Sequence, residues 1–198
     1  MRRKHRVVRI IAGKHRGRRL AAPEGLSVRP TSDRAREALF DILAHGRFGE
    51  RPIYEEARVL DAFAGTGAFG LEALSRGAQQ ASFIEKDRGA LAALRANIAA
   101  LGEQENAAVL AGDALRPPHA GAPARLAFLD PPYGENAAAP ALTALAAAGW
   151  LAPEALAVVE IAARQALTPP EGFTLLEERR YGAARIVFLR FGGGRGAG

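Results

Sequence analysis

Residues 57–70 have the sequence ARVLDAFAGTGAFG, in which a short apolar run leads into a GxGxxG spacing formed by Gly65, Gly67 and Gly70. Glycines let the backbone pass close to a ligand, and the helix that follows offers free N–H groups to a negative group. Glu85 lies 20 residues after Gly65, where an acidic side chain can accept hydrogen bonds from both hydroxyls of a ribose. This stretch therefore predicts a nucleoside-binding strand–loop–helix unit.

The pattern around this unit alternates between apolar runs and helical periodicity. We expect strands at 7–11, 57–63, 80–87, 107–114, 125–130 and 155–161, and helices at 67–77, 88–102 and 140–148. Residues 173–191 predict an antiparallel hairpin with its turn at Tyr181 and Gly182. Repeated β-α units predict a doubly wound, mostly parallel sheet of seven strands with helices on both faces, an α/β fold of the Rossmann-like type.

Charge divides the 198-residue chain into a basic N-terminal part and a mildly acidic remainder. Residues 1–40 carry 12 basic and 3 acidic side chains, and residues 41–198 carry 15 and 18, for a net charge of +6. We expect a basic arm and a capped helix within residues 1–50, the main domain within 51–192, and a flexible Gly-rich tail at 193–198. A basic arm on such a body predicts a polyanion as partner, although a solubilising tail has the same composition.

Composition excludes several classes of protein. The chain has no cysteine, which rules out disulfides, cysteine-ligated metals and a thiolate nucleophile. The longest uncharged stretch, 137–153, is Ala-rich and interrupted by prolines and a glycine, so it is too weakly apolar to span a bilayer. The four histidines have no partners at ligand spacing, and we predict no metal site. We expect a monomer that stays in the cytoplasm and does not bind a membrane.

Two acids decide between the nucleoside ligands that such a loop can hold. Asp61 stands four residues before Gly65, where a carboxylate would repel the pyrophosphate of a dinucleotide. The same carboxylate would attract the sulfonium and amino groups of S-adenosylmethionine. Asp113, after the third strand, could accept a hydrogen bond from the adenine amino group. Because ligands bind at the carboxyl ends of parallel strands, these acids favour S-adenosylmethionine.

The fourth strand runs into Asp130-Pro131-Pro132-Tyr133. Two prolines end the strand and turn carbonyls outward, so they form a rigid rim of acceptors. Asp130 and the Pro131 carbonyl can hold the two N–H bonds of an exocyclic amine on a base, while Tyr133 stacks on that base. Methylation at C5 of a pyrimidine commonly needs a thiolate, and this chain has none. The tetrapeptide therefore predicts methyl transfer to nitrogen, on guanine or adenine alike.

These motifs, together with IAGKHRGRRL and RPTSDRAREALFDIL, resemble the bacterial 16S rRNA guanine-N2 methyltransferase family from about residue 8 to 191. The resemblance implies a class I methyltransferase fold, S-adenosylmethionine as methyl donor with S-adenosylhomocysteine as product, and a guanine amine of 16S rRNA, or of the assembling 30S subunit, as acceptor. It implies a catalytic set of Asp130, Pro131, Pro132 and Tyr133. It also implies a cofactor site made of Asp61, Ala64, Gly65, Gly67, Glu85, Lys86, Asp113 and Ala114.

The arm supplies the predicted RNA contacts. Glycines in GKHRGRR let the backbone lie close to RNA, and arginines and lysines neutralise phosphates. The predicted RNA-binding residues are Lys14, Arg16, Arg18, Arg19, Arg29 and Arg34.

Three alternatives stay open at this point. An adenine-N6 methyltransferase on DNA or RNA would use the same DPPY motif. A nicotinamide-dependent oxidoreductase would explain the glycine loop and Glu85, but it would leave Asp61 and the arm unexplained. A non-catalytic RNA-binding protein on the same scaffold is the third.

Overall fold

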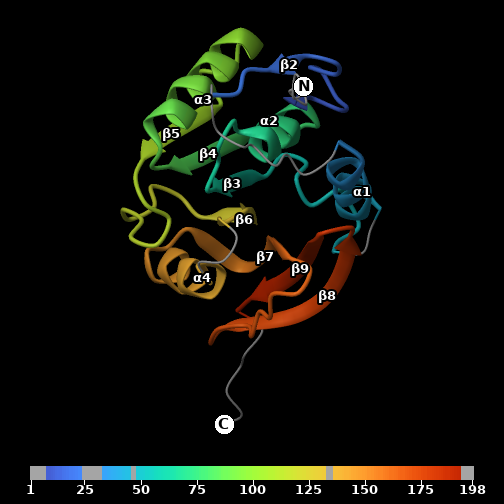
Figure 1. Cartoon of the computed structure of the whole chain (residues 1–198), viewed down its shortest axis with the longest axis vertical. Coiled ribbons are helices and arrows are strands. Elements are labelled where there is room, and N and C mark those ends of the chain that lie inside the picture. Colours follow the sequence, from blue (N-terminus) through green and yellow to red (C-terminus); the bar gives the residue numbers. More distant parts are fainter. Residues whose placement is uncertain (1–7, 24–32, 46–47, 133–135, 193–198) are drawn as a thin grey trace, which may run out of the picture.

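The fold is built on one seven-stranded sheet (Figure 1). The structure is a computed structural model that describes residues 8–23, 33–45, 48–132 and 136–192. Across the sheet the strands lie in the order β5 (Ala107–Ala111), β4 (Gln80–Glu85), β3 (Arg58–Ala62), β6 (Ala124–Leu129), β7 (Leu151–Ala162), β9 (Ala184–Phe191) and β8 (Phe173–Tyr181).

The first five strands in that order are parallel, and β9 is antiparallel to both of its neighbours. The mostly parallel, doubly wound α/β sheet predicted from the repeated β-α pattern is confirmed. The expected C-terminal hairpin is β8 and β9, and Gly182 with φ of 60° lies in its turn.

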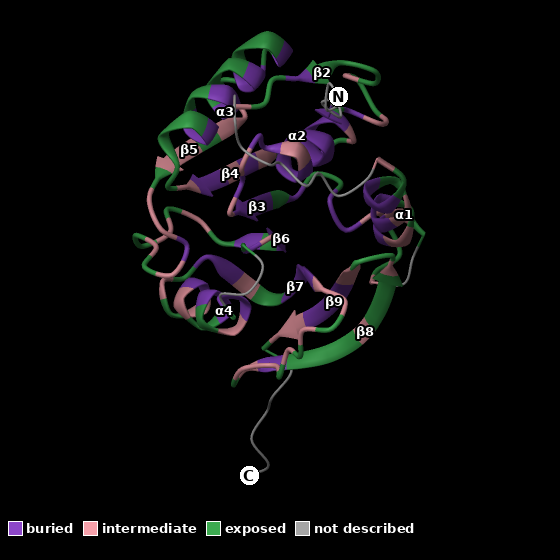
Figure 2. Ribbon diagram, in the orientation of Figure 1, coloured by how far each residue is buried: buried purple, intermediate pink, exposed green. Residues whose placement is uncertain are grey.

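Helices cover both faces of the sheet, as predicted. Helices α1 (Asp33–Ala44), α2 (Ala68–Ser75) and α3 (Arg88–Leu101) pack on one face, and α4 (Ala138–Ala147) packs on the other. Strand β3 shows why, because successive side chains of a strand point to opposite faces. Val59 joins the apolar core beneath α1, α2 and α3, whereas Leu60 joins the core beneath α4. Figure 2 shows the inner sides of the helices buried and their outer turns exposed.

Strand β7 begins earlier than the sequence predicts. It starts at Leu151, four residues before the expected start at Ala155, and it passes through Pro153. Opposite this point, the register with β6 shifts between Ala124 and Leu126, and Glu154 has a left-handed φ of 63°. A proline cannot donate to a ladder and is tolerated at such an irregularity, which explains the longer strand.

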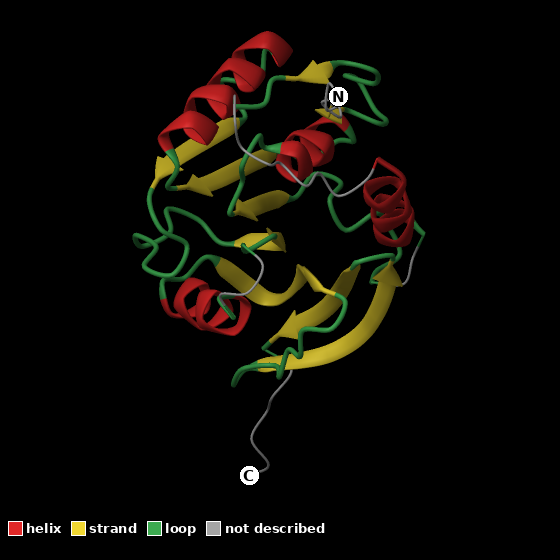
Figure 3. Cartoon of the chain, viewed as in Figure 1, coloured by secondary structure: helices red, strands yellow, loops and turns green. Residues whose placement is uncertain are grey.

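The described part of the basic arm is a hairpin docked on the helices. The expected strand near Val7–Ile11 is shorter, β1 (Val8–Arg9), and pairs with β2 (Arg19–Leu20), a strand the sequence did not predict. Val8, Ile10 and Leu20 are buried in the core beneath α1, α2 and α3. Figure 3 shows the two short strands beside α2 and α3. We call residues 8–23 the hairpin.

Two polar side chains of α2 hold this hairpin. The fully buried Glu72 carboxylate accepts hydrogen bonds from the backbone N–H groups of Ile11, at 2.7 Å, and Ala12, at 3.0 Å. Ser75 Oγ accepts from the His15 N–H at 3.0 Å and donates to the Ala12 carbonyl. These bonds satisfy hairpin backbone groups that no strand pairs with.

Among the described residues, no helix is long and apolar enough to cross a bilayer.

Candidate active site

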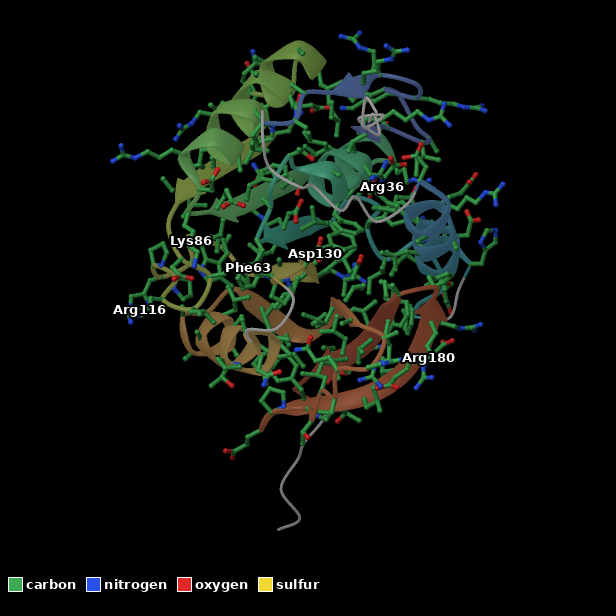
Figure 4. The ribbon with its side chains drawn as sticks, in the orientation of Figure 1. Arg36, Phe63, Lys86, Arg116, Asp130 and Arg180 are labelled. Atoms are coloured by element: carbon green, nitrogen blue, oxygen red, sulfur yellow. The ribbon has the colours of Figure 1, made fainter. Side chains whose placement is uncertain are left out.

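A cavity of about 280 Å³ opens where β3, β4, β5 and β6 end. This is the edge at which doubly wound sheets bind ligands. Figure 4 labels Phe63, Lys86 and Asp130 in this region. Acidic groups, prolines and apolar side chains share the wall, and the lining residues are Phe63, Ile84, Glu85, Lys86, Gly112, Asp113, Ala114, Asp130, Pro131 and Pro132.

The structure thus brings the predicted cofactor and catalytic groups together. Glu85, Lys86, Asp113 and Ala114 line the same cavity as Asp130 and its two prolines. Four other predicted residues are not among the described residues that line it: Asp61, Ala64, Gly65 and Gly67. These four form the strand end and loop next to Phe63.

Glu85 ties the glycine loop to the end of β4. Its Oε2 accepts a hydrogen bond from the Gly65 N–H at 2.7 Å, and its Oε1 accepts from the N–H groups of Lys86 and Asp87, each at 2.8 Å. A carboxylate offers about four acceptor positions. One position therefore remains for a ligand hydroxyl in the cavity.

Position 67 requires glycine for two reasons, its left-handed backbone conformation and the lack of space for a side chain. Its φ is 79°, and a Cβ placed there would lie 2.4 Å from Leu94 Cδ1 on α3. A side chain would therefore clash with α3 and strain the turn. The loop can stay close to α3 only with glycine at this position.

Asp61 belongs to β3, and its side chain contacts the first turn of α2. It is 2% exposed, and its Oδ2 accepts a hydrogen bond from the Gly70 N–H at 2.9 Å. The pKa of Asp61 is raised to about 7, mainly by burial and also by the negative charge of Glu85, while the hydrogen bond from the Gly70 N–H opposes the shift. A group poised near neutrality would ionise readily beside a cation.

Asp113 and Lys86 form an ion pair on the cavity wall. Lys86 Nζ lies 3.5 Å from Asp113 Oδ2, and Asp113 Oδ1 accepts from the Leu115 N–H at 3.0 Å. The turn after β5 therefore fixes the carboxylate at the cavity, and Lys86 partly neutralises it.

Asp130 sits in a strongly acidic environment. Its pKa is raised well above the usual value, first by desolvation and then by the negative charges of Glu160 and Asp61. Glu160 is 5% exposed. The β6–β7 register pairs Leu129 with Val159. The next residues on these neighbouring parallel strands are Asp130 and Glu160, so the two acids are adjacent. A carboxyl group of raised pKa can receive a proton at neutral pH more readily than an exposed aspartate can.

Two of the predicted site residues, Tyr133 and Arg29, lie outside the described residues. Of the other predicted RNA-binding residues, Arg16, Arg19 and Arg34 are exposed.

The remaining two, Lys14 and Arg18, contact the body of the protein. Lys14 Nζ lies 2.7 Å from Glu103 Oε1, and Arg18 donates to the Ala100 carbonyl at 2.7 Å. Burial alone would raise the pKa of Glu103, but hydrogen bonds from Lys14, Asn106 and His15 lower it below its usual value. The Lys14 charge is therefore matched within the fold.

Sequence reasoning missed two residues that shape the site. Phe63 lines the cavity with a left-handed φ of 64°, which is rare for an aromatic residue. Its place between Asp61 and Gly65 in the quoted stretch was the available signal. Asn97 on α3 is 3% exposed and donates to the carbonyl of Thr66, inside the glycine loop, at 3.0 Å. Nothing in its local sequence distinguishes it from an ordinary polar helix residue.

Comparison with known proteins gives one consistent result. A family model described as "Conserved hypothetical protein 95" matches residues 8–190. Over 174 residues the chain is 41% identical to "Ribosomal RNA small subunit methyltransferase D" of Escherichia coli, which covers 87% of this chain and 84% of that protein. The protein of the same name from Haemophilus influenzae is 38% identical, with 88% and 89% covered. A solved structure, "Putative methyltransferase yhhF from Escherichia coli", superposes with a TM-score of 0.79 at 39% identity and covers 93% of this chain and 98% of that one.

Proposed function

Because this chain belongs to the conserved hypothetical protein 95 family of rRNA methyltransferases, we propose that it methylates the exocyclic N2 amine of a guanine in 16S rRNA. The methyl donor is S-adenosylmethionine, and S-adenosylhomocysteine is the second product. One observation carries the proposal most directly. Asp130, Pro131 and Pro132 line the same cavity as Glu85 and Asp113, so an amine-holding motif faces a nucleoside-binding wall.

The cavity fits S-adenosylmethionine by its donor and acceptor set. Glu85 keeps one free acceptor position for the ribose, and Asp113 offers a carboxylate oxygen to the adenine amine. Asp61 and Asp130 are carboxyl groups of raised pKa, and both can ionise next to the cationic groups of the cofactor when it is bound. When bound, the cofactor supplies an electrophilic methyl group on a sulfonium.

The chain's own residues then position the amine. Asp130 and the Pro131 carbonyl accept its two N–H bonds and leave the nitrogen lone pair aimed at the methyl carbon. The bound cofactor would give up its methyl group to the amine nitrogen, and its sulfur would keep the electrons of the broken S–CH₃ bond. The amine proton passes to Asp130, whose raised pKa suits it as acceptor. In this proposal Tyr133 stacks on the flipped guanine, a role that rests on its place in the motif.

Substrate binding belongs to the basic N-terminal part in this proposal. Residues 1–50 contact RNA, and residues 51–192 carry the chemistry. Arg16, Arg19 and Arg34 are exposed and able to contact phosphates, as is Arg18 beyond its one bond to α3. We propose that the enzyme acts as a monomer on 16S rRNA or on the assembling 30S subunit.

The test is transfer of labelled methyl groups to small-subunit rRNA and to immature 30S particles, followed by digestion and identification of the nucleoside. We expect N2-methylguanosine. Asp130→Asn should lower kcat by about 10² to 10⁴-fold, the usual contribution of a positioned acid–base group. Binding of S-adenosylhomocysteine should change little, because the adenine and ribose contacts remain.

The matched control is Asp41→Asn, since Asp41 is an exposed residue of α1. This variant should keep wild-type kcat. N6-methyladenosine in the digest would replace the guanine proposal with the adenine alternative. Equal activity of wild type and Asp130→Asn would remove the catalytic assignment.

A further inference from the structure

Helix α3 carries an exposed row of positive charge that the proposed chemistry does not use. No acidic residue occurs between Arg88 and Leu101. Arg88 and Arg95 are seven residues apart, which places them about 20° from each other around the helix axis. Ala92 and Ala99 lie on the same side, and all four residues are exposed. We call this row of Arg88, Ala92, Arg95 and Ala99 the α3 stripe.

The two arginines of the stripe differ from several described basic residues that are paired with acids. Lys14 is paired with Glu103, Arg9 with Asp33, and Arg76 with Glu72. Within residues 8–23, 33–45, 48–132 and 136–192, Arg88 and Arg95 form no hydrogen bond or ion pair. No acid in the described part of the chain neutralises these two charges.

The stripe joins the two places where RNA is expected. Its first residue follows Lys86, which lines the cavity, and Asp87, which caps the helix. Its other end lies next to Ala100, whose carbonyl accepts from Arg18 of the hairpin. Fourteen residues at 1.5 Å each make the helix about 21 Å long. The base in the cavity and the tip of the hairpin are thus separated by about one helix length.

The hairpin also follows α3 back toward the cavity. Arg18 bonds to Ala100, Ala21 bonds to Asn97, and a Cβ built on Gly89 would lie 3.5 Å from Pro23 Cβ. Residues 18–23 therefore run along the helix on a flank that lies about 100° or more around its axis from the stripe. Figure 2 shows the outer turns of α3 and the hairpin on one exposed side of the molecule.

We propose that the α3 stripe, with Arg16, Arg18 and Arg19 of the hairpin, binds the sugar–phosphate backbone of the RNA whose base occupies the cavity. The inference rests on the proposed function for the identity of the substrate. Charge of one sign separated by alanines suits a polyanion, since the small side chains let a phosphate backbone approach. A protein partner would be expected to find aromatic or large apolar anchors, which this row does not contain.

Phosphate contacts are recognised by their salt dependence. Each neutralised phosphate contributes about 0.7 to 0.9 to the slope of log affinity against log salt concentration. Arg88→Ala with Arg95→Ala should therefore lower the magnitude of the slope by about 1.5 for small-subunit rRNA transcribed in vitro. The wild type should bind RNA more tightly than this double variant does. The ratio of the two affinities should fall about eightfold when the salt concentration rises from 50 to 200 mM. KM for RNA should rise, and the Kd for S-adenosylhomocysteine should stay the same.

The matched control removes two other exposed arginines, Arg58 and Arg125. They begin β3 and lie near the start of β6, and their alternation with Leu60 and Leu129 places them on the α4 face of the sheet. Arg58→Ala with Arg125→Ala changes the net charge equally but should leave the slope at the wild-type value. Circular dichroism and Tm establish that both double variants are folded.

Three results would overturn the inference. One is an unchanged slope in the α3 double variant, and another is an equal change in both double variants, which would reduce the effect to net charge. The third is an α3 double variant that binds naked rRNA as tightly as the wild type does and loses activity only on 30S particles. That result would make a ribosomal protein the partner. Failure of the proposed function is separate, because it appears as absence of methyl transfer by the wild type, while the binding slopes can still be measured.

Discussion

The side-chain amide of Asn97 donates a hydrogen bond of 3.0 Å to the carbonyl of Thr66, the residue between the first two glycines of the loop. The same amide group donates to the Ala21 carbonyl at 3.1 Å and accepts from the Ala21 N–H at 2.7 Å. One buried side chain of α3 therefore contacts both the glycine loop and the end of the hairpin. The position of the loop depends on a residue that belongs to neither segment.

This contact predicts a specific loss in Asn97→Ala. Leaving buried backbone groups of Thr66 and Ala21 without partners costs about 1–3 kcal/mol. We expect the Kd for S-adenosylhomocysteine to rise by about 5- to 100-fold in calorimetry, because the loop loses its anchor. Asn106→Ala is the matched control, since Asn106 bonds to Glu103 beyond the C-terminal end of α3 and not to the glycine loop. Equal Kd values for Asn97→Ala and the wild type would contradict a role for Asn97 in positioning the loop.

The raised pKa of Asp61 predicts how stability depends on pH. The folded protein keeps the Asp61 proton up to about pH 7, whereas the unfolded chain releases it near its ordinary value of 3.8. The folded state thus binds more protons between these values, and the free energy of unfolding falls as pH rises through this window. Asp61→Asn removes this contribution, which amounts to at most about 4 kcal/mol.

Urea unfolding at pH 5 and pH 8 measures the effect. We expect Asp61→Asn to lose less stability than the wild type between the two values, while the exposed control Asp41→Asn behaves like the wild type. An equal loss in Asp61→Asn and in the wild type would show that Asp61 ionises at its ordinary pKa in the folded protein.

Two glycines of the hairpin provide a matched pair of substitutions. Gly13 and Gly17 both have φ of 82°, so alanine at either position carries the same left-handed strain of about 1–2 kcal/mol. A Cβ on Gly13 would lie 1.8 Å from the Ser75 carbonyl oxygen, whereas a Cβ on Gly17 meets nothing within 4 Å. Gly13→Ala should therefore lower the Tm clearly more than Gly17→Ala does, and it should expose the hairpin to limited proteolysis. Indistinguishable Tm values would mean that the hairpin does not dock closely on Ser75.

The buried Glu72 predicts the largest loss of stability. Its carboxylate binds two hairpin N–H groups and lies 2.7 Å from Arg76 Nε and 4.0 Å from the buried Arg36 Nε. Glu72→Gln leaves Arg76 without its counter-charge and Arg36 with Asp33 alone. Removing one partner of a buried pair typically costs about 3–5 kcal/mol, so about that loss is expected in urea unfolding.

Glu37→Gln, at an exposed position of α1, is the control and should change the free energy of unfolding by less than about 0.5 kcal/mol. A similarly small change in Glu72→Gln would show that the hairpin does not depend on this carboxylate.

Local patterns were sufficient for most of the sheet and for part of the site. Apolar runs and helical periodicity predicted all seven strands of the main sheet and all four helices, because each has a side that must be buried. Strand β2 was missed, since RGRRL has too little apolar character to predict a strand on its own. It forms because Leu20 reaches the core while its backbone pairs with β1.

The order of the elements and the motifs at the strand ends follow from local sequence, because glycines, prolines and acids act on the backbone and ligands close to them. Which basic side chains are paired depends instead on the packing of distant segments. Lys14 and Arg95 are both exposed basic residues, yet Glu103, 89 residues after Lys14, pairs with Lys14, and no described acid pairs with Arg95. Charge neutralisation depends on distance in space, and that distance is set by how the hairpin and α3 pack.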